Sequence, residues 1–171
     1  MRKRREYVDG AAYHVTSRTN DKIRVFHNKL GRRIMLLALE EAKEKYGFTL
    51  HNFCVMPTHF HLLITPANGT NLSRIIQWIK TRSAKHWNGI HGSIDHLWGE
   101  RFFSRPVKDL RDYFTIFKYI DQNPVKAGLV DNPPDWKASG AYYIANDICG
   151  FVDYLPMERL SYVKLLPPPK R

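Results

Sequence analysis

The chain has 171 residues, of which 27 are lysine or arginine and 16 are aspartate or glutamate, so its formal net charge is +11. This length suits one domain with a hydrophobic core and leaves little room for a second. The charge excess favours a polyanionic partner, because lysine and arginine release condensed counterions when they neutralise phosphates. No stretch reaches the roughly 18 uninterrupted apolar residues of a membrane-spanning helix, so we expect no membrane partner.

The N-terminal sequence and the two cysteines indicate where the protein works. Residues 1–11 are predicted to form a basic arm, with no apolar segment behind them that would make a signal peptide. Cys54 and Cys149 are isolated and match neither a disulfide framework nor a zinc motif. A cytoplasmic, nucleoid-associated protein in a reducing setting is therefore expected.

The first half of the chain predicts a strand, a helix and a hairpin. Residues 12–18 are rich in β-branched and aromatic side chains and predict a strand. Apolar residues then recur at helical spacing from about residue 28 to 46, and Gly47 is typical of a helix end. Residues 48–55 predict a second strand, joined by a tight turn at residues 56–58 to a third strand.

The third predicted strand carries two histidines with one residue between them. Side chains alternate faces along a strand, so His59 and His61 should share one face while Phe60, Leu62 and Ile64 occupy the other. Two neighbouring imidazoles backed by a hydrophobic layer make one half of a metal site.

The second half predicts two more helices and one more strand. A helix over residues 72–88 has an apolar side and an opposite side with basic residues. Residues 97–105 predict a strand that Pro106 stops. A helix from about Leu110 should end near Asn123, because the residue before Pro124 disfavours the helical region.

This order of elements predicts an α+β fold of the ferredoxin-like split βαβ type. Two helices would cover one face of an antiparallel sheet and leave the other face open, with the last helix beside it. We assign residues 12–145 to one catalytic domain and residues 146–171 to a C-terminal extension.

The last helix supplies further candidate residues. Its buried face is predicted to consist of Leu110, Tyr113, Phe114, Ile116, Phe117 and Ile120. Tyr119 and Asn123 then lie away from that face and, being i and i+4, next to each other. Both could reach a metal-bound substrate.

Two segments carry a family resemblance. CVMPTHFHLLIT and YIDQNPVKAGLV resemble the two signature segments of the single-tyrosine HUH transposases, specifically the REP-associated tyrosine transposase branch. AYHVTSRTNDK, LWGERFF and WKASGAYY also resemble that branch, so the likeness covers about residues 7–143.

The resemblance implies a DNA strand-transfer enzyme that nicks and rejoins single-stranded or hairpin DNA through a 5′-phosphotyrosine. It implies that His59 and His61 bind a divalent metal, Mg²⁺ or Mn²⁺, that Tyr119 is the nucleophile and that Asn123 is the third ligand. Relatives in the wider family carry glutamine at the Asn123 position, and the shorter asparagine has the same carbonyl ligand. This chemistry needs a metal because an anionic phosphodiester resists attack until its charge is stabilised.

Several basic residues are candidates for phosphate contacts. The alternative for Arg74, Arg82 and Lys85 is an ordinary solvated helix face, and for the N-terminal arginines it is a soluble tail. The candidate DNA-binding residues are Arg4, Arg5, Arg18, Arg74, Arg82, Lys85, Arg101 and Arg105.

His14 is interpreted as a structural residue, with DNA contact as the alternative.

Two other functions fit parts of the pattern. The first is a non-catalytic protein that binds single-stranded nucleic acid on the same fold, although a binding sheet does not need the two histidines. The second is a zinc hydrolase that uses water, although no acidic residue adjoins the histidines to act as its base. The oligomeric state is open between a monomer and a homodimer.

Overall fold

The computed structural model describes residues 8, 10–92 and 96–153. Most of the predicted basic arm, including Arg4 and Arg5, lies outside the described residues, as does the end of the predicted C-terminal extension.

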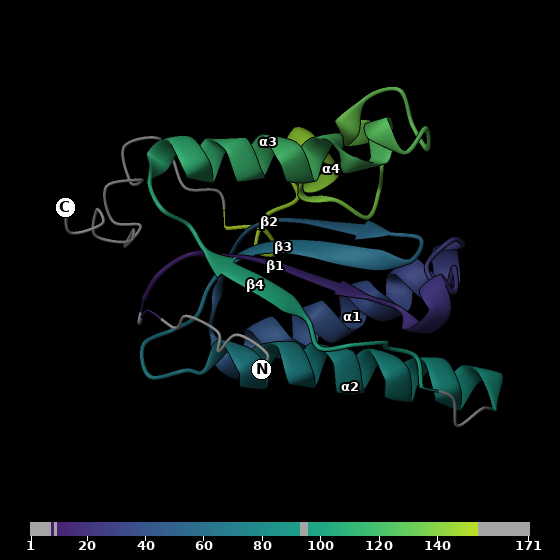
Figure 1. Ribbon diagram of the computed structural model, residues 1–171. Coiled ribbons are helices and arrows are strands. Elements are labelled where there is room, and N and C mark those ends of the chain that lie inside the picture. The colour runs from purple at the N-terminus through teal and green to yellow at the C-terminus, as the bar shows by residue number, and fades with distance from the viewer. Residues whose placement is uncertain (1–7, 9, 93–95, 154–171) are drawn as a thin grey trace.

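The described residues form a four-stranded sheet with four α-helices (Figure 1). The strands are β1 (Tyr13–Arg18), β2 (Thr49–Met56), β3 (His59–Thr65) and β4 (Phe103–Pro106). The α-helices are α1 (Lys29–Tyr46), α2 (Leu72–His91), α3 (Leu110–Lys126) and α4 (Gly140–Ala145), and short 3₁₀ helices lie at Asn20–Lys22 and Pro133–Asp135. The strand order is β2-β3-β1-β4 and every neighbouring pair is antiparallel, which confirms the ferredoxin-like fold.

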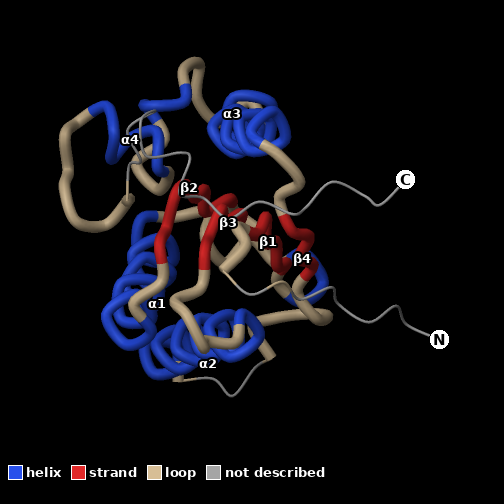
Figure 2. Tube along the Cα trace, turned by 90° about the vertical axis from the view of Figure 1, so that its left-hand side faces the viewer, coloured by secondary structure: helices blue, strands red, loops and turns tan. Residues whose placement is uncertain are grey.

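The helices lie on both faces of the sheet. Figure 2 shows α1 and α2 on one face, with α3 and the short α4 on the other. The α3 helix contacts β2 and β3, the two strands of the hairpin. The face predicted to be open is therefore partly covered by α3, which brings the helix that carries Tyr119 over the strand that carries the histidines.

The helix ends follow from local chemistry. The side chain of Asn28 accepts a hydrogen bond from the Gly31 N–H at the start of α1, and Gly47 ends that helix with φ +62°. Asp109 accepts the Asp112 N–H at 2.7 Å and so caps the start of α3. Such caps use N–H groups that have no partner inside the helix.

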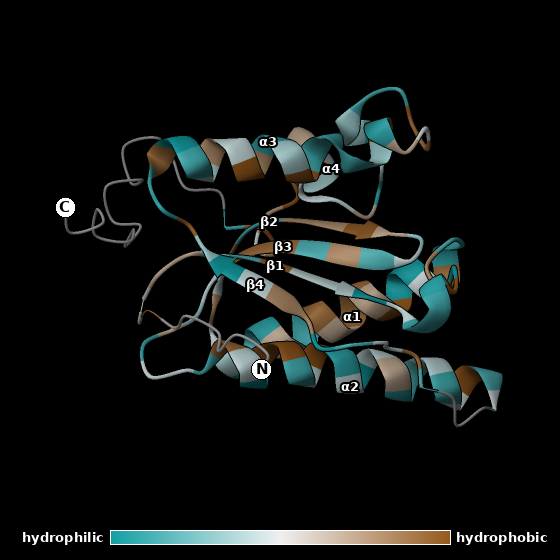
Figure 3. Ribbon diagram, viewed as in Figure 1, coloured by the Kyte–Doolittle hydropathy of each residue, from teal (hydrophilic) through white to brown (hydrophobic). Residues whose placement is uncertain are grey.

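The core lies mainly between the sheet and the α1/α2 layer. Phe60, Leu62 and Ile64 are fully buried, and the Phe60 ring contacts the Trp98 ring at 5.3 Å between centroids. In Figure 3 much of β2 and parts of β3 are brown, whereas each long helix carries both hydrophobic and hydrophilic residues. The hydrophobic layer predicted behind the two histidines is therefore present.

Two predicted elements have different lengths in the structure. The α2 helix runs three residues further than residue 88, to His91, and Gly92 caps its end with φ +63°. The predicted strand over residues 97–105 is reduced to β4, and Trp98 pairs with Thr19 only as an isolated bridge. The Trp98 indole N–H also binds α2, donating to the Lys80 carbonyl at 2.9 Å and to the Ser83 hydroxyl at 3.0 Å.

The prediction that α3 ends near Asn123 was wrong, because the helix continues through Pro124 to Lys126. Proline lacks an N–H, so only one hydrogen bond of the helix is lost. The Asn123 carbonyl still accepts the Ala127 N–H at 3.0 Å, and the Pro124 carbonyl accepts the Leu129 N–H at 2.9 Å. The ring of Pro124 is buried, and this packing offsets the lost bond.

The buried face of α3 is narrower than predicted. Leu110 and Phe114 are 43% and 45% exposed, contrary to the prediction. Only one stripe of the helix faces the sheet, and its buried members are Tyr113, Ile116, Ile120 and Pro124.

The chain beyond α4 returns to the sheet. Phe151 and Val152 are buried in the core, and the Asp153 carboxylate accepts hydrogen bonds from Lys43 Nζ and Leu50 N, both at 2.8 Å. These residues lie in the predicted C-terminal extension and pack on the sheet and α1. In the part of the chain that the structure describes, no helix is long and apolar enough to cross a membrane.

Candidate active site

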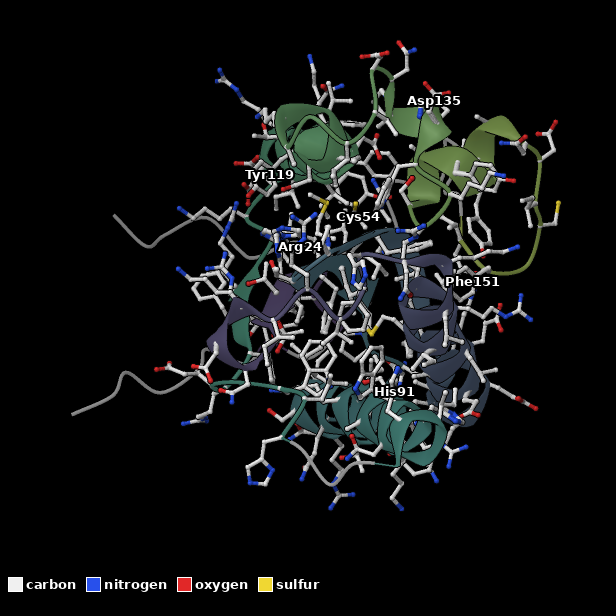
Figure 4. The ribbon with its side chains drawn as sticks, turned by 90° about the vertical axis from the view of Figure 1, so that its right-hand side faces the viewer. Arg24, Cys54, His91, Tyr119, Asp135 and Phe151 are labelled. Carbon is white, nitrogen blue, oxygen red and sulfur yellow. The ribbon has the colours of Figure 1, made fainter. Side chains whose placement is uncertain are left out.

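The predicted catalytic residues meet at a cavity of about 1100 Å³ between the sheet and α3. His59 and His61 of β3 line it together with Tyr119 of α3. β1 contributes His14, Thr16 and Arg18 from one strand face, and residues 99–105 form a further wall. Figure 4 shows Tyr119 between α3 and the sheet.

The two histidines share one face of β3, as their spacing predicts. Their ring centroids are 5.0 Å apart at an interplanar angle of 81°. His61 is 5% exposed, and its Nε2 is buried without a hydrogen-bond partner among the described residues. The Thr58 hydroxyl lies 3.0 Å from His59 Nδ1, so a hydrogen bond there leaves the other ring nitrogen of His59 available.

His14 contacts His61 from the neighbouring strand. His14 Nε2 lies 3.1 Å from His61 Nδ1, and the two rings are stacked with centroids 5.4 Å apart. A histidine that ligates a metal through Nε2 carries its proton on Nδ1, where a second group usually accepts it. His14 Nε2 occupies the position of that acceptor.

Burial keeps these imidazoles uncharged. Burial, and to a smaller extent His59, lowers the pKa of His61 to about 3. Burial and Arg18 lower the pKa of His59 to about 4, and burial and Arg105 lower the pKa of His14 to about 4. All three are neutral near pH 7, which is the form that binds a metal ion.

The residues present therefore fit a divalent metal held by His59 and His61. The buried, unpartnered Nε2 of His61 and the neutral imidazole of His59 together form a suitable donor pair for Mn²⁺. The pair also suits Mg²⁺ if oxygen ligands complete the shell. Among the described residues there is no group of three or more His, Cys, Asp or Glu side chains that could hold a metal ion. An amide or a phosphate oxygen would be a compatible third ligand for this donor pair.

Tyr119 lies at the edge of the buried stripe of α3. Its ring contacts the His61 ring at 5.4 Å and the His14 ring at 5.9 Å, in both cases edge to face. The side chain is 41% exposed, so its ring is held by the histidines on one side and open on the other. Lys126 Nζ lies 5.5 Å from the ring centroid.

Asn123 does not line the cavity in the structure. Its Nδ2 donates a 2.7 Å hydrogen bond to the carbonyl of Tyr119, one turn earlier in α3. The i, i+4 relationship predicted for these residues is thus realised within the helix. The role of Asn123 as a third metal ligand stays a prediction.

The predicted DNA-binding residues fall into two separate groups. Arg18, Arg101 and Arg105 line the cavity. The Arg105 guanidinium forms two hydrogen bonds with the Asp112 carboxylate, at 2.7 and 2.9 Å, so its charge is compensated.

The second group lies on α2, on the opposite face of the sheet (Figure 1). Arg82 donates two hydrogen bonds to Glu41 of α1, whereas Arg74 and Lys85 have no such pairing with any residue that the structure describes. This group is separated from Tyr119 by the sheet, and its contact with DNA stays a prediction.

The sequence did not predict the roles of two residues that line the cavity. His14 was interpreted as structural, and its contact with His61 depends on the pairing of β1 with β3. Phe103 was not singled out, although Arg101, Phe103 and Arg105 alternate along the chain and all line the cavity. This alternation could have indicated from the sequence that the three side chains share one face of a strand.

Comparisons with known proteins agree with this geometry. A sequence profile described as "Transposase IS200 like" matches residues 7–123. The chain is 27% identical over 146 residues to a "Putative REP-associated tyrosine transposase" of Haemophilus influenzae, covering 80% of this chain and 82% of that protein. It is likewise 27% identical over 146 residues to the REP-associated tyrosine transposase of Escherichia coli, covering 80% and 79%. The resemblance predicted from the two signature segments is confirmed.

Solved structures with the same fold include a REP-associated tyrosine transposase bound to a REP hairpin. The TM-score is 0.72 at 22% sequence identity, over 100% of this chain and 98% of that chain. A putative transposase from Deinococcus radiodurans has a TM-score of 0.51 at 21% identity, over 71% of this chain and 97% of that chain.

Proposed function

Because the chain belongs to the IS200-like transposase family, we propose that it nicks and rejoins single-stranded or hairpin DNA through a covalent bond between Tyr119 and a 5′-phosphate. One observation carries this proposal: the Tyr119 ring from α3 contacts the His61 ring from β3, at 5.4 Å, inside one cavity. A nucleophile next to a metal-binding imidazole is the arrangement that phosphodiester cleavage requires.

In the proposed reaction the Tyr119 hydroxyl oxygen attacks the phosphorus atom. The new bond joins the tyrosine oxygen to phosphorus, and the bond that breaks joins phosphorus to the 3′ oxygen. The phenol loses its proton to water, and the leaving 3′ oxygen gains one. The reverse attack by a 3′-hydroxyl on another end rejoins the DNA and restores the tyrosine, so no external energy source is needed.

The other residues hold these groups in place. His59 and His61 would hold the metal, with Asn123 as the proposed third ligand. Bound Mg²⁺ or Mn²⁺ would supply Lewis acidity by polarising a non-bridging phosphate oxygen. Asn123 would have to leave the Tyr119 carbonyl to ligate. His14 orients His61 through the 3.1 Å contact between Nε2 and Nδ1.

The DNA is proposed to lie across the cavity, with Arg18 and Arg101 contacting its phosphates. Arg105 could join them only by sharing its bonds with Asp112. Arg74, Arg82 and Lys85 would meet a longer DNA that passes around to α2. The preference for hairpins rests on the relative whose structure holds a REP hairpin.

Packing of α3 on its own sheet supports action within one chain. The helix contacts β2 and β3, and Tyr119 already lies beside the histidines of the same chain. We therefore propose that cleavage takes place within a monomer, with Tyr119 and the histidines supplied by the same chain.

The test is the formation of a covalent adduct. The protein would be incubated with end-labelled single-stranded hairpin oligonucleotides, including the flanks of its own gene, with Mn²⁺, Mg²⁺ or chelator, and run on a denaturing gel. We expect a shifted, labelled protein band that needs metal and is lost in Tyr119→Phe. Tyr142→Phe, on α4, is the matched control and should keep the band.

Three other outcomes would contradict the proposed mechanism. An adduct that persists in Tyr119→Phe would refute the assignment of the nucleophile. Metal-dependent cleavage without any adduct would favour a hydrolase that uses water. Tight binding with neither cleavage nor adduct would favour a non-catalytic nucleic-acid-binding protein.

A further inference from the structure

Phe103 is an exposed aromatic residue inside the cavity. It is the first residue of β4, its side chain is 58% exposed, and it lines the same cavity as Tyr119. The neighbouring Phe102 is only 8% exposed and belongs to the hydrophobic core. Phe102 therefore fills the core at this edge of the sheet, so core packing does not explain the presence of an exposed aromatic ring at Phe103.

The strand register puts Phe103 in line with the metal-binding face. On β1, Thr16 is paired with His61 of β3 on one side and with Phe103 of β4 on the other. These three residues form a row across the sheet, and all line the cavity. Since neighbouring strands lie about 4.8 Å apart, the backbone of Phe103 is about 10 Å from that of His61.

The charges around Phe103 favour an anionic chain. Four cationic side chains line the cavity, of which Arg105 is compensated by Asp112, and two acidic ones, Asp21 and Glu100, accompany them. Arg101 is exposed and lies two residues before Phe103, and Arg18 is exposed at the end of β1 next to His59. An aromatic ring between arginines is the combination that binds single-stranded nucleic acid, because bases stack on the ring while phosphates meet the cations.

We propose that Phe103 is a stacking platform for an unpaired nucleobase close to the scissile phosphate, with Arg101 and Arg18 binding the adjoining phosphates. This rests on the proposed function, because it assumes that DNA occupies the cavity. Stacking on Phe103 needs a free base face, which a paired base inside a duplex does not offer. The platform therefore selects DNA that is single-stranded beside the cleavage position and tolerates many base identities there.

The test measures binding of a fluorescein-labelled oligo(dT) 15-mer by anisotropy, over a range of salt concentrations. Phe103→Leu keeps an apolar side chain but removes the aromatic face, and Phe103→Trp keeps the face. We expect Phe103→Leu to weaken binding roughly 5- to 100-fold, whereas Phe103→Trp binds like the unmodified protein. Phe114→Leu is the matched control, because Phe114 is 45% exposed on α3 and does not line the cavity.

The dependence on salt separates stacking from a general loss of structure or charge. Phe103→Leu should keep the slope of log K against log salt, because no phosphate contact is lost, whereas Arg101→Gln should lower that slope by about 1. The fluorescence of a strand carrying 2-aminopurine should be quenched on binding to Tyr119→Phe protein. The double variant Phe103→Leu/Tyr119→Phe should quench it less, because the aromatic face is gone.

The outcomes for the platform and for catalysis are distinguishable. Binding by Phe103→Leu within twofold of the unmodified protein would overturn the platform, even if the phosphotyrosine adduct forms. Conversely, binding that depends on Phe103 without any adduct would sustain the platform and count against the proposed enzyme activity. Equal weakening by Phe103→Leu and Phe103→Trp would also overturn stacking as the cause.

Discussion

Asn52 of β2 donates a 2.8 Å hydrogen bond from Nδ2 to the carboxylate of Asp121, two residues after Tyr119 on α3. Asn52 is fully buried, and its Nδ2 also donates to the Phe117 carbonyl at 3.2 Å. Its Oδ1 accepts the Phe53 N–H at 2.7 Å. One side chain thus joins the sheet to the helix that carries the proposed nucleophile.

Asn52→Ala should lower the free energy of unfolding by about 1–3 kcal/mol, because it removes the side-chain donor from the partly buried Asp121 carboxylate and from the Phe117 carbonyl. Adduct formation should fall as well, because α3 is held less firmly over the histidines. Urea denaturation and the gel assay measure the two effects. Asn132→Ala is the control: Asn132 makes an exposed 3.2 Å hydrogen bond to Asp135, and its loss should change stability by less than about 0.5 kcal/mol. An unchanged stability in Asn52→Ala would contradict this account.

Burial lowers the pKa of His51 to about 4, with Asp153 acting weakly in the opposite direction. In the folded protein His51 is therefore neutral between pH 6.5 and 4, while in the unfolded chain it binds a proton. Titration of His51 therefore leaves the free energy of unfolding unchanged above pH 6.5. It lowers that free energy by about 3 kcal/mol in total as the pH falls towards 4.

Replacement of His51 isolates this contribution. His51→Gln cannot titrate but keeps a group that can bond to the Thr65 hydroxyl, which lies 2.8 Å from His51 Nε2. Denaturation curves at pH 7.5, 6 and 5 should show a smaller loss of stability for His51→Gln than for the unmodified protein. Parallel losses in the two proteins would mean that His51 is not responsible.

The histidine pair should bind Mn²⁺ in the absence of DNA. In isothermal titration, His59→Ala and His61→Ala should abolish binding, because each removes a ligand. His14→Ala should weaken binding about 10- to 100-fold, because His61 loses the group that holds its Nδ1 proton. His51→Gln, a change at a buried histidine outside the cavity, should leave binding unchanged. Full affinity in His61→Ala would exclude the proposed metal site.

The two basic groups should respond differently to the length of the DNA. Arg18→Gln, in the cavity, should weaken binding of both an 8-nucleotide strand and a long hairpin, and it should lower the salt slope by about 1 for each. Arg74→Gln makes the same charge change on α2 and should weaken binding of the long hairpin alone. Anisotropy titrations with the two DNAs measure this. If Arg74→Gln also weakened binding of the short strand, DNA would not be centred on the cavity.

Local sequence patterns were sufficient to predict much of the fold and part of the candidate site. Alternation along residues 59–64 predicted that His59 and His61 share a face, and Gly47 correctly marked the end of α1. The order of strands and helices predicted the ferredoxin-like fold, and two ordered segments predicted the family. These features depend on backbone geometry within a few residues, or on motifs that can be compared directly.

Contacts between distant segments could not be predicted in the same way. The His14 contact with His61 depends on the register of β1 against β3, and the exposure of Phe103 depends on which side of β4 faces the cavity. The continuation of α3 through Pro124 was missed, because burial of the proline ring outweighs the local preference to end the helix. Periodicity shows which side of a single element is apolar, whereas the approach of Tyr119 to His61 arises from packing between residues 58 positions apart in the chain.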